Sequence, residues 1–331
     1  MLLLNLIKVV RFIFKFFKTQ NQFNEQFIDS YLQPFYKQYN KQLKESTLHK
    51  IKKIYGFGIP LTVVAYTKLH GRNITERERQ YATLVGICTP LVDDFTDEKS
   101  LSSEAINQLI FSPNDYEPVT LEEGIVKSIG CYLLGKVKNV DGFLYSLQQT
   151  VHAQHWSQRQ MDPDVSRNEL RDIALAKGGW SQILPHYIID EVPTQQTLDT
   201  FYMVGGLVQM YSDIFEVYKD FKDGIATFAN TCDDYKALEE HYINECRKFV
   251  KAAKALPYKK RDKDLYITFY VLVVVSTAIV ALRKLSKLQI RLGGGVLPFA
   301  QLDRKQLICD MEKPVNLFEA VWVAQTILLK K

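Results

Sequence analysis

Seven long stretches of this chain place apolar residues three and four positions apart, which is the spacing of one face of an α-helix. They cover residues 76–94, 121–136, 141–160, 195–221, 234–255, 264–288 and 313–329. The alternation and hairpin turns of β-strands are nearly absent. Proline or glycine clusters separate the stretches at 112–115, 162–164, 192–194 and 293–295. The pattern therefore predicts an all-α protein, a bundle of about ten helices in one domain.

Local signals define one of these helices in more detail. Thr75 followed by Glu78 predicts a capping box at the start of the stretch 76–94. Pro90, one turn before Asp93, predicts that this helix kinks or ends there.

Composition and charge narrow the class of protein. The chain has 331 residues, of which 47% are hydrophobic, enough to bury the core of a large domain. Its net charge is only +5 and its basic residues form local clusters, so we expect no nucleic-acid partner. The five cysteines are odd in number, widely spaced and without a CxxC pair. This usage predicts reduced thiols in a cytoplasmic protein, with neither a disulfide framework nor a zinc site.

Residues 1–20 form the first of two segments that bear on membranes. Four cations interrupt an otherwise apolar sequence there: Lys8, Arg11, Lys15 and Lys18. At 100° per residue they lie within about 80° of one another on a helix. A narrow basic face beside a broad apolar face is typical of helices at the membrane interface, where anionic lipid attracts the cations. The alternative is an N-terminal helix that packs on its own all-α domain, residues 21–331.

The second segment, residues 265–282, reaches the length of a membrane-spanning helix. It also contains Thr268, Ser276 and Thr277, and a large helical domain needs central helices that are apolar all round. We interpret the segment as a core helix, with a membrane span as the alternative. The expected localisation is cytoplasmic, with peripheral contact at the inner face of the membrane.

Two acidic clusters end otherwise apolar stretches. The first, DDFTD, places Asp93 and Asp97 on one helical face, with Asp94 about 100° away. Like charges at this spacing repel each other. Mg²⁺ would compensate for the repulsion, because it binds carboxylate oxygens together with substrate phosphates. The alternative is a solvated cap at a helix end.

The second cluster lies in SDIFEVYKD, where Asp213, Glu216 and Asp220 are spaced i, i+3 and i+7. This spacing predicts one acidic face on a helix that is otherwise aromatic and aliphatic. The alternative is a solvated stripe that pairs with Lys219 or Lys222.

A third feature is ALAKGGWSQIL, in which Lys177 precedes Gly178 and Gly179. The two glycines predict a break or kink in the helix that frees backbone N–H groups. A lysine beside such groups suits a diphosphate contact. The alternative is an ordinary helix end, with lysine in the last turn and glycine after it.

The order and spacing of these three features resemble the class I isoprenoid synthase superfamily, over about residues 75–225. In that family the first acidic motif is DDxxD, which Asp93, Asp94 and Asp97 match letter for letter. Lys177 is similar to the lysine at a helix break in the trans-prenyl diphosphate synthases.

Two further matches are looser. The family's second motif, a DDxxD followed four positions on by another Asp, is similar to residues 212–220. The segment SQRQMD resembles the family's GQxxD motif and adds Gln160 as a candidate.

The resemblance implies an antiparallel bundle with a central apolar cavity, and two acidic motifs that face each other across its mouth. It also implies three Mg²⁺ ions that bridge the carboxylates to an allylic prenyl diphosphate. The implied metal ligands are Asp93, Asp97, Asp213, Glu216 and Asp220, with Asp94 in support. The implied contacts to the diphosphate are Lys177, Gln160 and Lys219.

The activity implied is ionisation of an allylic prenyl diphosphate to a terpene or terpene alcohol. Prenyl transfer, which joins two prenyl units, is the alternative. Against it, no arginine follows Asp97 in EKSLSSEAINQL, and the chain has no Gly-Lys-Arg segment. A third hypothesis is that the chain is not an enzyme but a membrane-peripheral protein derived from this fold. It stays open because Val217 and Phe221 occupy positions where terpene cyclases carry further metal ligands.

Overall fold

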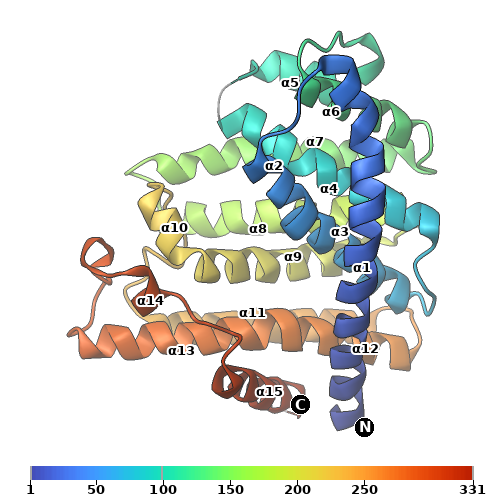
Figure 1. Cartoon of the computed structure of the whole chain (residues 1–331). Coiled ribbons are helices and arrows are strands. Elements are labelled where there is room, and N and C mark those ends of the chain that lie inside the picture. The colour runs from blue at the N-terminus through green and yellow to red at the C-terminus, as the bar shows by residue number, and fades with distance from the viewer. Residues whose placement is uncertain (1, 98–99, 330–331) are drawn as a thin grey trace. The chain divides into compact units, whose positions relative to one another are not determined.

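The computed structural model describes the backbone of residues 2–97 and 100–329, and the side chains of residues 4–96 and 100–329. Over these residues the chain is all-helical, with 79% helix and no β-strand, which confirms the predicted all-α class (Figure 1). The contacts divide the chain into two compact units. Unit 1 comprises Met1–Val9, Ser146–Leu184 and Pro193–Lys331, and unit 2 comprises Val10–Tyr145 and Pro185–Val192.

Unit 2 is built mainly from the helices of the first half of the chain. They are α1 (Leu2–Tyr39, from Val10 on), α2 (Glu45–His49), α3 (Gly56–Leu69), α4 (Glu76–Asp97), α5 (Ser103–Phe111), α6 (Leu121–Leu134) and the start of α7 (Val140–Ser157), with a π-helical turn η1 (Lys50–Tyr55) and a 3-10 turn η2 (Pro113–Asp115). α4 packs against α3, η1 and α6. The helix predicted over residues 1–20 runs on to Tyr39, and α4 continues through Pro90 rather than ending there.

The capping box predicted at the start of α4 is confirmed. The Thr75 N–H donates to Glu78 Oε2 at 2.9 Å, and the Glu78 N–H donates to Thr75 Oγ1 at 3.2 Å. Glu78 also accepts two hydrogen bonds from the Arg72 guanidinium, at 2.9 and 2.6 Å, and one from the Asp190 N–H at 3.2 Å. This carboxylate, 1% exposed, therefore fastens the segment Pro185–Val192 to the rest of unit 2.

Replacing Glu78 by glutamine is expected to destabilise the protein by about 3 kcal/mol at pH 7. Burial alone would raise the pKa of Glu78, but the hydrogen bonds from Arg72, Thr75 and Asp190 outweigh it and lower the pKa to about 2. A depressed folded-state pKa contributes stability above the unfolded value, and this contribution is lost as the pH falls from about 4.5 to 2. Urea unfolding at pH 7 and pH 3 should show a smaller difference at pH 3. The exposed neighbour Glu76→Gln is the control, and an equal effect of both variants at pH 7 would contradict the assignment.

Unit 1 stacks four long helices side by side: α8 (Arg167–Ile183), α9 (Gln195–Phe215), α11 (Tyr235–Ala255) and α13 (Ser276–Arg291) (Figure 1). The shorter elements are η3 (Gln158–Met161), η4 (Leu184–Ile188), α10 (Val217–Lys222), α12 (Lys260–Tyr270), η5 (Val271–Val275), η6 (Phe299–Gln301), α14 (Arg304–Leu307) and α15 (Pro314–Leu329). On α11, Tyr235, Tyr242 and Phe249 follow each other at seven-residue intervals and are fully buried. The Tyr242 hydroxyl donates to the Leu207 carbonyl of α9 at 2.9 Å, so this aromatic face joins the two helices.

The apolar segment 265–282 belongs to one continuous helix, Lys260–Arg291, formed by α12, η5 and α13. This helix is long and apolar enough to cross a membrane, and 83% of its most apolar window is buried inside the structure. Such burial is typical of the core helix that we expected here. The four breaks marked by proline or glycine lie between α-helices, as predicted, although the first of them contains the 3-10 turn η2.

Candidate functional site

The second acidic motif supplies two buried carboxylates in unit 1. Asp213, on the last turn of α9, is 5% exposed, and Asp220 on α10 is 7% exposed. The predicted single acidic face is wrong in one respect, because α9 ends at Phe215 and a new helix begins at Val217. The fold nevertheless buries both aspartates close enough for the charge of Asp213 to raise the pKa of Asp220.

Burial is the largest influence on the pKa values of Asp213 and Asp220. It raises the pKa of Asp213 to about 6, although a hydrogen bond from Gln209 and the charge of Lys177 act in the opposite direction. Burial raises the pKa of Asp220 to about 7, and repulsion from Asp213 and Glu216 adds to the effect. Two ionised carboxylates are thus costly here without a cation, which makes this donor set suitable for a divalent metal ion.

One residue that contacts Asp213 was not predicted. Gln209 donates from Nε2 to Asp213 Oδ1 at 2.9 Å. Its position four residues before Asp213, one turn earlier on the same helical face, is the signal that could have indicated this contact.

Glu216, the third acid of the motif, lies at the surface. Its side chain is 52% exposed and lies 4.0 Å from Lys219, which is also 3.8 Å from Asp223. Lys219, predicted to contact diphosphate, therefore pairs with surface carboxylates in this structure. A contact of this kind between exposed groups contributes little stability, so both side chains can rearrange at small cost.

The helix that carries Lys177 packs against α9, and the charge of Lys177 acts to lower the pKa of both buried aspartates. The predicted helix break beside it is wrong: α8 continues from Arg167 to Ile183 through Gly178 and Gly179. The predicted free N–H groups at this point are therefore absent, and Lys177 approaches the aspartates from an intact helix.

The glycines serve a different purpose, which is a close contact between α8 and α9. A Cβ atom built on Gly178 would lie 2.1 Å from the Gly205 carbonyl oxygen, and one built on Gly205 would lie 2.2 Å from the Gly178 oxygen. Only residues without a Cβ allow two helices this close. The contact brings the helix of Lys177 next to the helix of Asp213.

Gln160, which the sequence suggested as a diphosphate contact, holds a loop in this structure. Its Nε2 donates to the Ala226 carbonyl at 2.9 Å, and its own backbone carbonyl accepts from the Ala226 N–H at 2.7 Å. These two bonds fasten the segment after α10 to η3. In this structure the side-chain amide therefore has a structural partner.

The first acidic motif lies in unit 2, on the last turns of α4. The Tyr55 hydroxyl donates to Asp93 Oδ2 at 3.0 Å. Asp94 accepts from Lys50 Nζ at 2.8 Å and from the Thr47 hydroxyl at 3.1 Å. Lys50 and Tyr55 begin and end the π-helical turn η1, a rare conformation that often marks functional sites. The side chain of Asp97, together with Glu98, lies outside the described residues.

The convergence of the two acidic motifs stays a prediction, since they belong to different units. Among the described residues, no group of three or more His, Cys, Asp and Glu side chains is arranged to hold a metal ion. Two cavities lie beside α13, α14 and α15, and none of the predicted site residues lines them. The implied central apolar cavity is therefore also still a prediction.

Comparison of the chain with models of protein families, with curated proteins and with solved structures finds no match.

Proposed function

We propose that this protein is a Mg²⁺-dependent enzyme that ionises an allylic prenyl diphosphate and releases a terpene or terpene alcohol. The observation that carries the proposal is the burial in unit 1 of two mutually repelling carboxylates, Asp213 and Asp220, on whose pKa values the charge of Lys177 also acts. Buried like charges are costly, and a cation between the carboxylates and an anionic substrate would offset the cost.

The chain's own residues suit three tasks in this reaction. Asp213 and Asp220, with Glu216 as a mobile third group, would hold the metal, and Lys177 would contact the diphosphate. Bound Mg²⁺ would supply charge neutralisation of the leaving diphosphate as the C–O bond breaks. The aromatic rings of Tyr211 and Phe215, whose centroids are 4.7 Å apart on the same end of α9, offer apolar faces that could stabilise an allylic cation.

The direct test measures diphosphate release from geranyl, farnesyl, geranylgeranyl and longer allylic diphosphates, with Mg²⁺ and with EDTA. Release that requires Mg²⁺ supports the proposal, and the best substrate identifies the chain length. A second prenyl diphosphate added to the same assay distinguishes prenyl transfer, because transfer yields a longer product. A folded protein that releases no diphosphate from any substrate would refute the proposed activity.

One observation favours the rival, a non-catalytic membrane-peripheral protein. Asp93 and Asp94 already have hydrogen-bond partners in Tyr55, Thr47 and Lys50, so they help to hold α4 against α2 and η1. For such a protein these acids would be purely structural. The diphosphate-release assay separates the two functions, since the rival binds membranes without releasing diphosphate.

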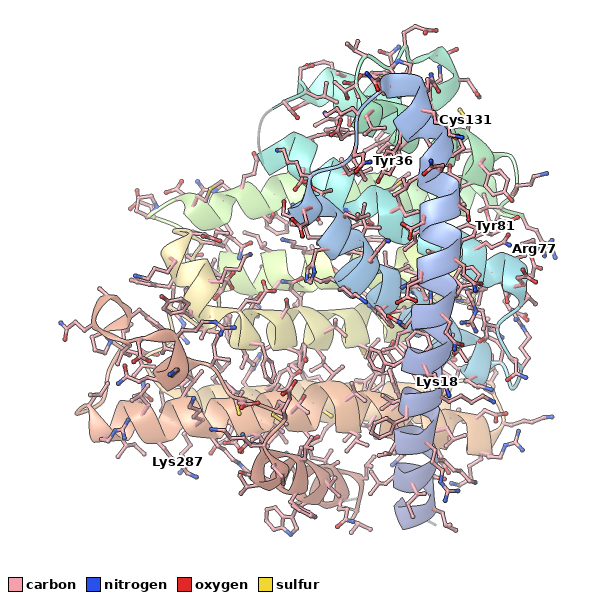
Figure 2. All side chains as sticks on the ribbon, viewed as in Figure 1. Lys18, Tyr36, Arg77, Tyr81, Cys131 and Lys287 are labelled. Atoms are coloured by element: carbon pink, nitrogen blue, oxygen red, sulfur yellow. The ribbon has the colours of Figure 1, made fainter. Side chains whose placement is uncertain are left out.

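Membrane contact is part of both proposals, and α1 has the matching surface. Several of its apolar residues are exposed, and four of them form one row, Ile7, Val10, Phe14 and Phe17. At 100° per residue this row spans about 80° and directly adjoins the row of four cations. Lys18, the last of the cations, is exposed on α1 (Figure 2). An exposed apolar row beside a cationic row is the surface that binds anionic lipid.

Vesicles that contain anionic lipid are expected to bind the protein, whereas neutral vesicles bind it weakly. Each exposed cation contributes about 1 kcal/mol near an anionic membrane. Replacing Lys8, Arg11, Lys15 and Lys18 by glutamine should therefore weaken binding by about two to three orders of magnitude. Cosedimentation at low and physiological salt measures the effect. Equal binding of the wild type to neutral and anionic vesicles would contradict the assignment.

A further inference from the structure

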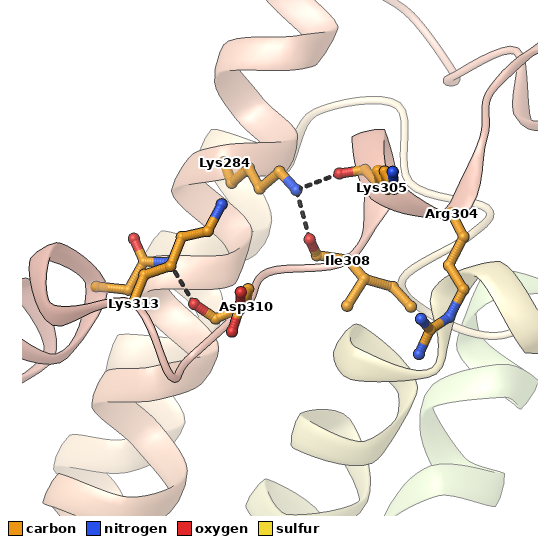
Figure 3. A pocket seen from close by; sticks show the side chains of 7 residues that line it. Lys284, Arg304, Lys305, Ile308, Asp310 and Lys313 are labelled. Carbon is orange, nitrogen blue, oxygen red and sulfur yellow. Dashed lines mark hydrogen bonds between the residues drawn. The ribbon is translucent and has the colours of Figure 1, made fainter.

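A cavity of about 660 Å³ lies in unit 1 beside α13, α14 and the start of α15 (Figure 3). Its volume is within the range of small-molecule binding sites, roughly 300–1,000 Å³. The polar groups of its wall are Lys284, Arg304, Lys305, Lys313, Asp310 and Asn316. Four cationic side chains against one carboxylate leave the wall with a net positive charge of about three.

The cations of this wall have no carboxylate partners among the described residues. None of the four appears in an ion pair there, which distinguishes them from Arg283, the residue before Lys284. Arg283 is paired with Glu239 at 2.9 Å and with Glu319 at 3.0 Å. No direct ion pair within the described chain neutralises these four cations, although the charges of Asp303 and Asp310 act on Lys284. With four cations against one carboxylate in the wall, an anion entering the cavity would meet an attractive field.

Lys284 is held in place before any ligand binds. Its ammonium group donates to the Lys305 carbonyl at 2.9 Å and to the Ile308 carbonyl, which fixes the amine at the cavity wall. An ammonium group has three N–H donors, so one remains for a ligand. Burial lowers the pKa of Lys284, and the nearby charge of Lys313 lowers it further, whereas the charges of Cys309, Asp303 and Asp310 act in the opposite direction. In Figure 3 the Lys284 amine points toward these two carbonyls, and Lys313 lies close enough for its charge to act on Lys284.

A second cavity of about 460 Å³ shares Lys284 and Asn316 with the first. It adds the cations Lys287, labelled in Figure 2, and Arg291 to the wall. The positive surface therefore continues along α13, which gives room for a ligand larger than a single phosphate group.

We propose that this cavity binds the phosphate groups of a small phosphorylated ligand with a charge of about −2 or −3. Lys284 and Lys313 hold the phosphate, Arg304 offers a planar pair of donors, and the side-chain oxygens of Asp310 and Asn316 accept from hydroxyl groups of the ligand. The site is separate from Asp213 and Lys177 and does not rest on the proposed activity. Its phosphate can belong to a soluble metabolite or to a lipid headgroup, and α15 presents exposed Val315, Phe318 and Trp322 next to the cavity.

The test is titration calorimetry of the full chain with inorganic diphosphate in EDTA, where a magnesium site cannot contribute. We expect saturable binding at one site. The variant Arg304→Gln/Lys313→Gln removes two exposed cations whose side chains have no structural partner among the described residues, so the fold is retained. Loss of two charge-assisted contacts should weaken binding by about a hundredfold.

Two control variants show whether the loss of binding is specific to this cavity. Lys251→Gln/Lys254→Gln removes the same charge from α11, and Lys177→Gln alters the proposed catalytic site. The first control is expected to bind diphosphate as the wild type does, and the second to keep the binding that Arg304→Gln/Lys313→Gln loses. Failure of the wild type to bind would overturn the proposal, as would binding that is lost in Lys177→Gln and kept in the double variant.

A second arm identifies the source of the phosphate. Phosphatidylcholine vesicles with and without phosphatidic acid are sedimented with wild type and with Arg304→Gln/Lys313→Gln. Retention that needs phosphatidic acid, needs the two cations and is displaced by diphosphate indicates a lipid headgroup. Binding of diphosphate without such retention indicates a soluble ligand. Binding of neither probe would refute the site.

Discussion

Replacing Asp213 by asparagine is expected to reduce Mg²⁺-dependent release of diphosphate by about two to three orders of magnitude. The carboxylate is buried beside Asp220 and near Lys177, where a bound cation would be shielded from water. Asparagine keeps the size and one oxygen of the side chain but removes the charge that attracts the metal. The measurement is initial-rate release of diphosphate from the best allylic substrate at saturating Mg²⁺.

The stability of the same variant shows whether it is folded. Because burial raises the pKa of Asp213 to about 6, the ionised carboxylate destabilises the folded state at higher pH. This cost is present above pH 6 and disappears as the pH falls to the unfolded value near 3.8. In EDTA at pH 8, Asp213→Asn should therefore be more stable than the wild type by about 2–3 kcal/mol, and at about pH 4 the two should be alike.

A loss of activity together with a gain in stability cannot result from unfolding. Asp223→Asn is the matched control: this exposed aspartate, 3.8 Å from Lys219, lies just after α10 and should keep full activity. If Asp213→Asn kept wild-type activity, the proposed role of the second acidic motif would be wrong, whatever the stability of the variant.

Replacing Gly205 by alanine is expected to destabilise unit 1 by about 3–5 kcal/mol. The new Cβ atom would lie 2.2 Å from the Gly178 carbonyl oxygen, which is backbone and cannot turn away as a side chain would. α8 and α9 must then separate, and the apolar packing between them is lost. This loss exceeds the gain of about 1 kcal/mol that alanine brings to a helix through its better helix propensity.

Gly58→Ala provides the comparison, because Gly58 also lies in a helix but a Cβ atom added there would have no other atom within 4 Å. At this position the gain in helix propensity should appear undiminished, at about 0.5–1 kcal/mol of added stability. Urea unfolding of both variants at neutral pH measures the difference. Similar midpoints for Gly205→Ala and the wild type would show that the two helices accommodate a methyl group.

The features that the sequence predicted well are those that depend on neighbouring residues. Helical periodicity, the Thr75–Glu78 capping box and the breaks at proline and glycine clusters involve residues within one or two turns of each other. Backbone hydrogen bonds within a helix are also local, so the all-α class follows from the spacing of apolar residues alone.

The features that the sequence did not predict depend on distant partners. Gly178 predicts a helix break from its low propensity, but Gly205 on the next helix is the reason for glycine at that position. Likewise, the partners of Asp94 are Thr47 and Lys50, more than forty residues earlier in the chain. The pattern DDFTD was visible in the sequence, whereas the groups that bind its carboxylates emerge only from the fold.

The division into two units has a consequence for biosynthesis. The chain passes from one unit to the other after Val9, Tyr145, Leu184 and Val192, so neither unit is a continuous stretch of sequence. On the ribosome, unit 2 cannot be completed until Pro185–Val192 has emerged, by which time part of unit 1 has already been made. A single cut cannot release either unit whole, and a truncation from either end that removes one unit also removes residues of the other.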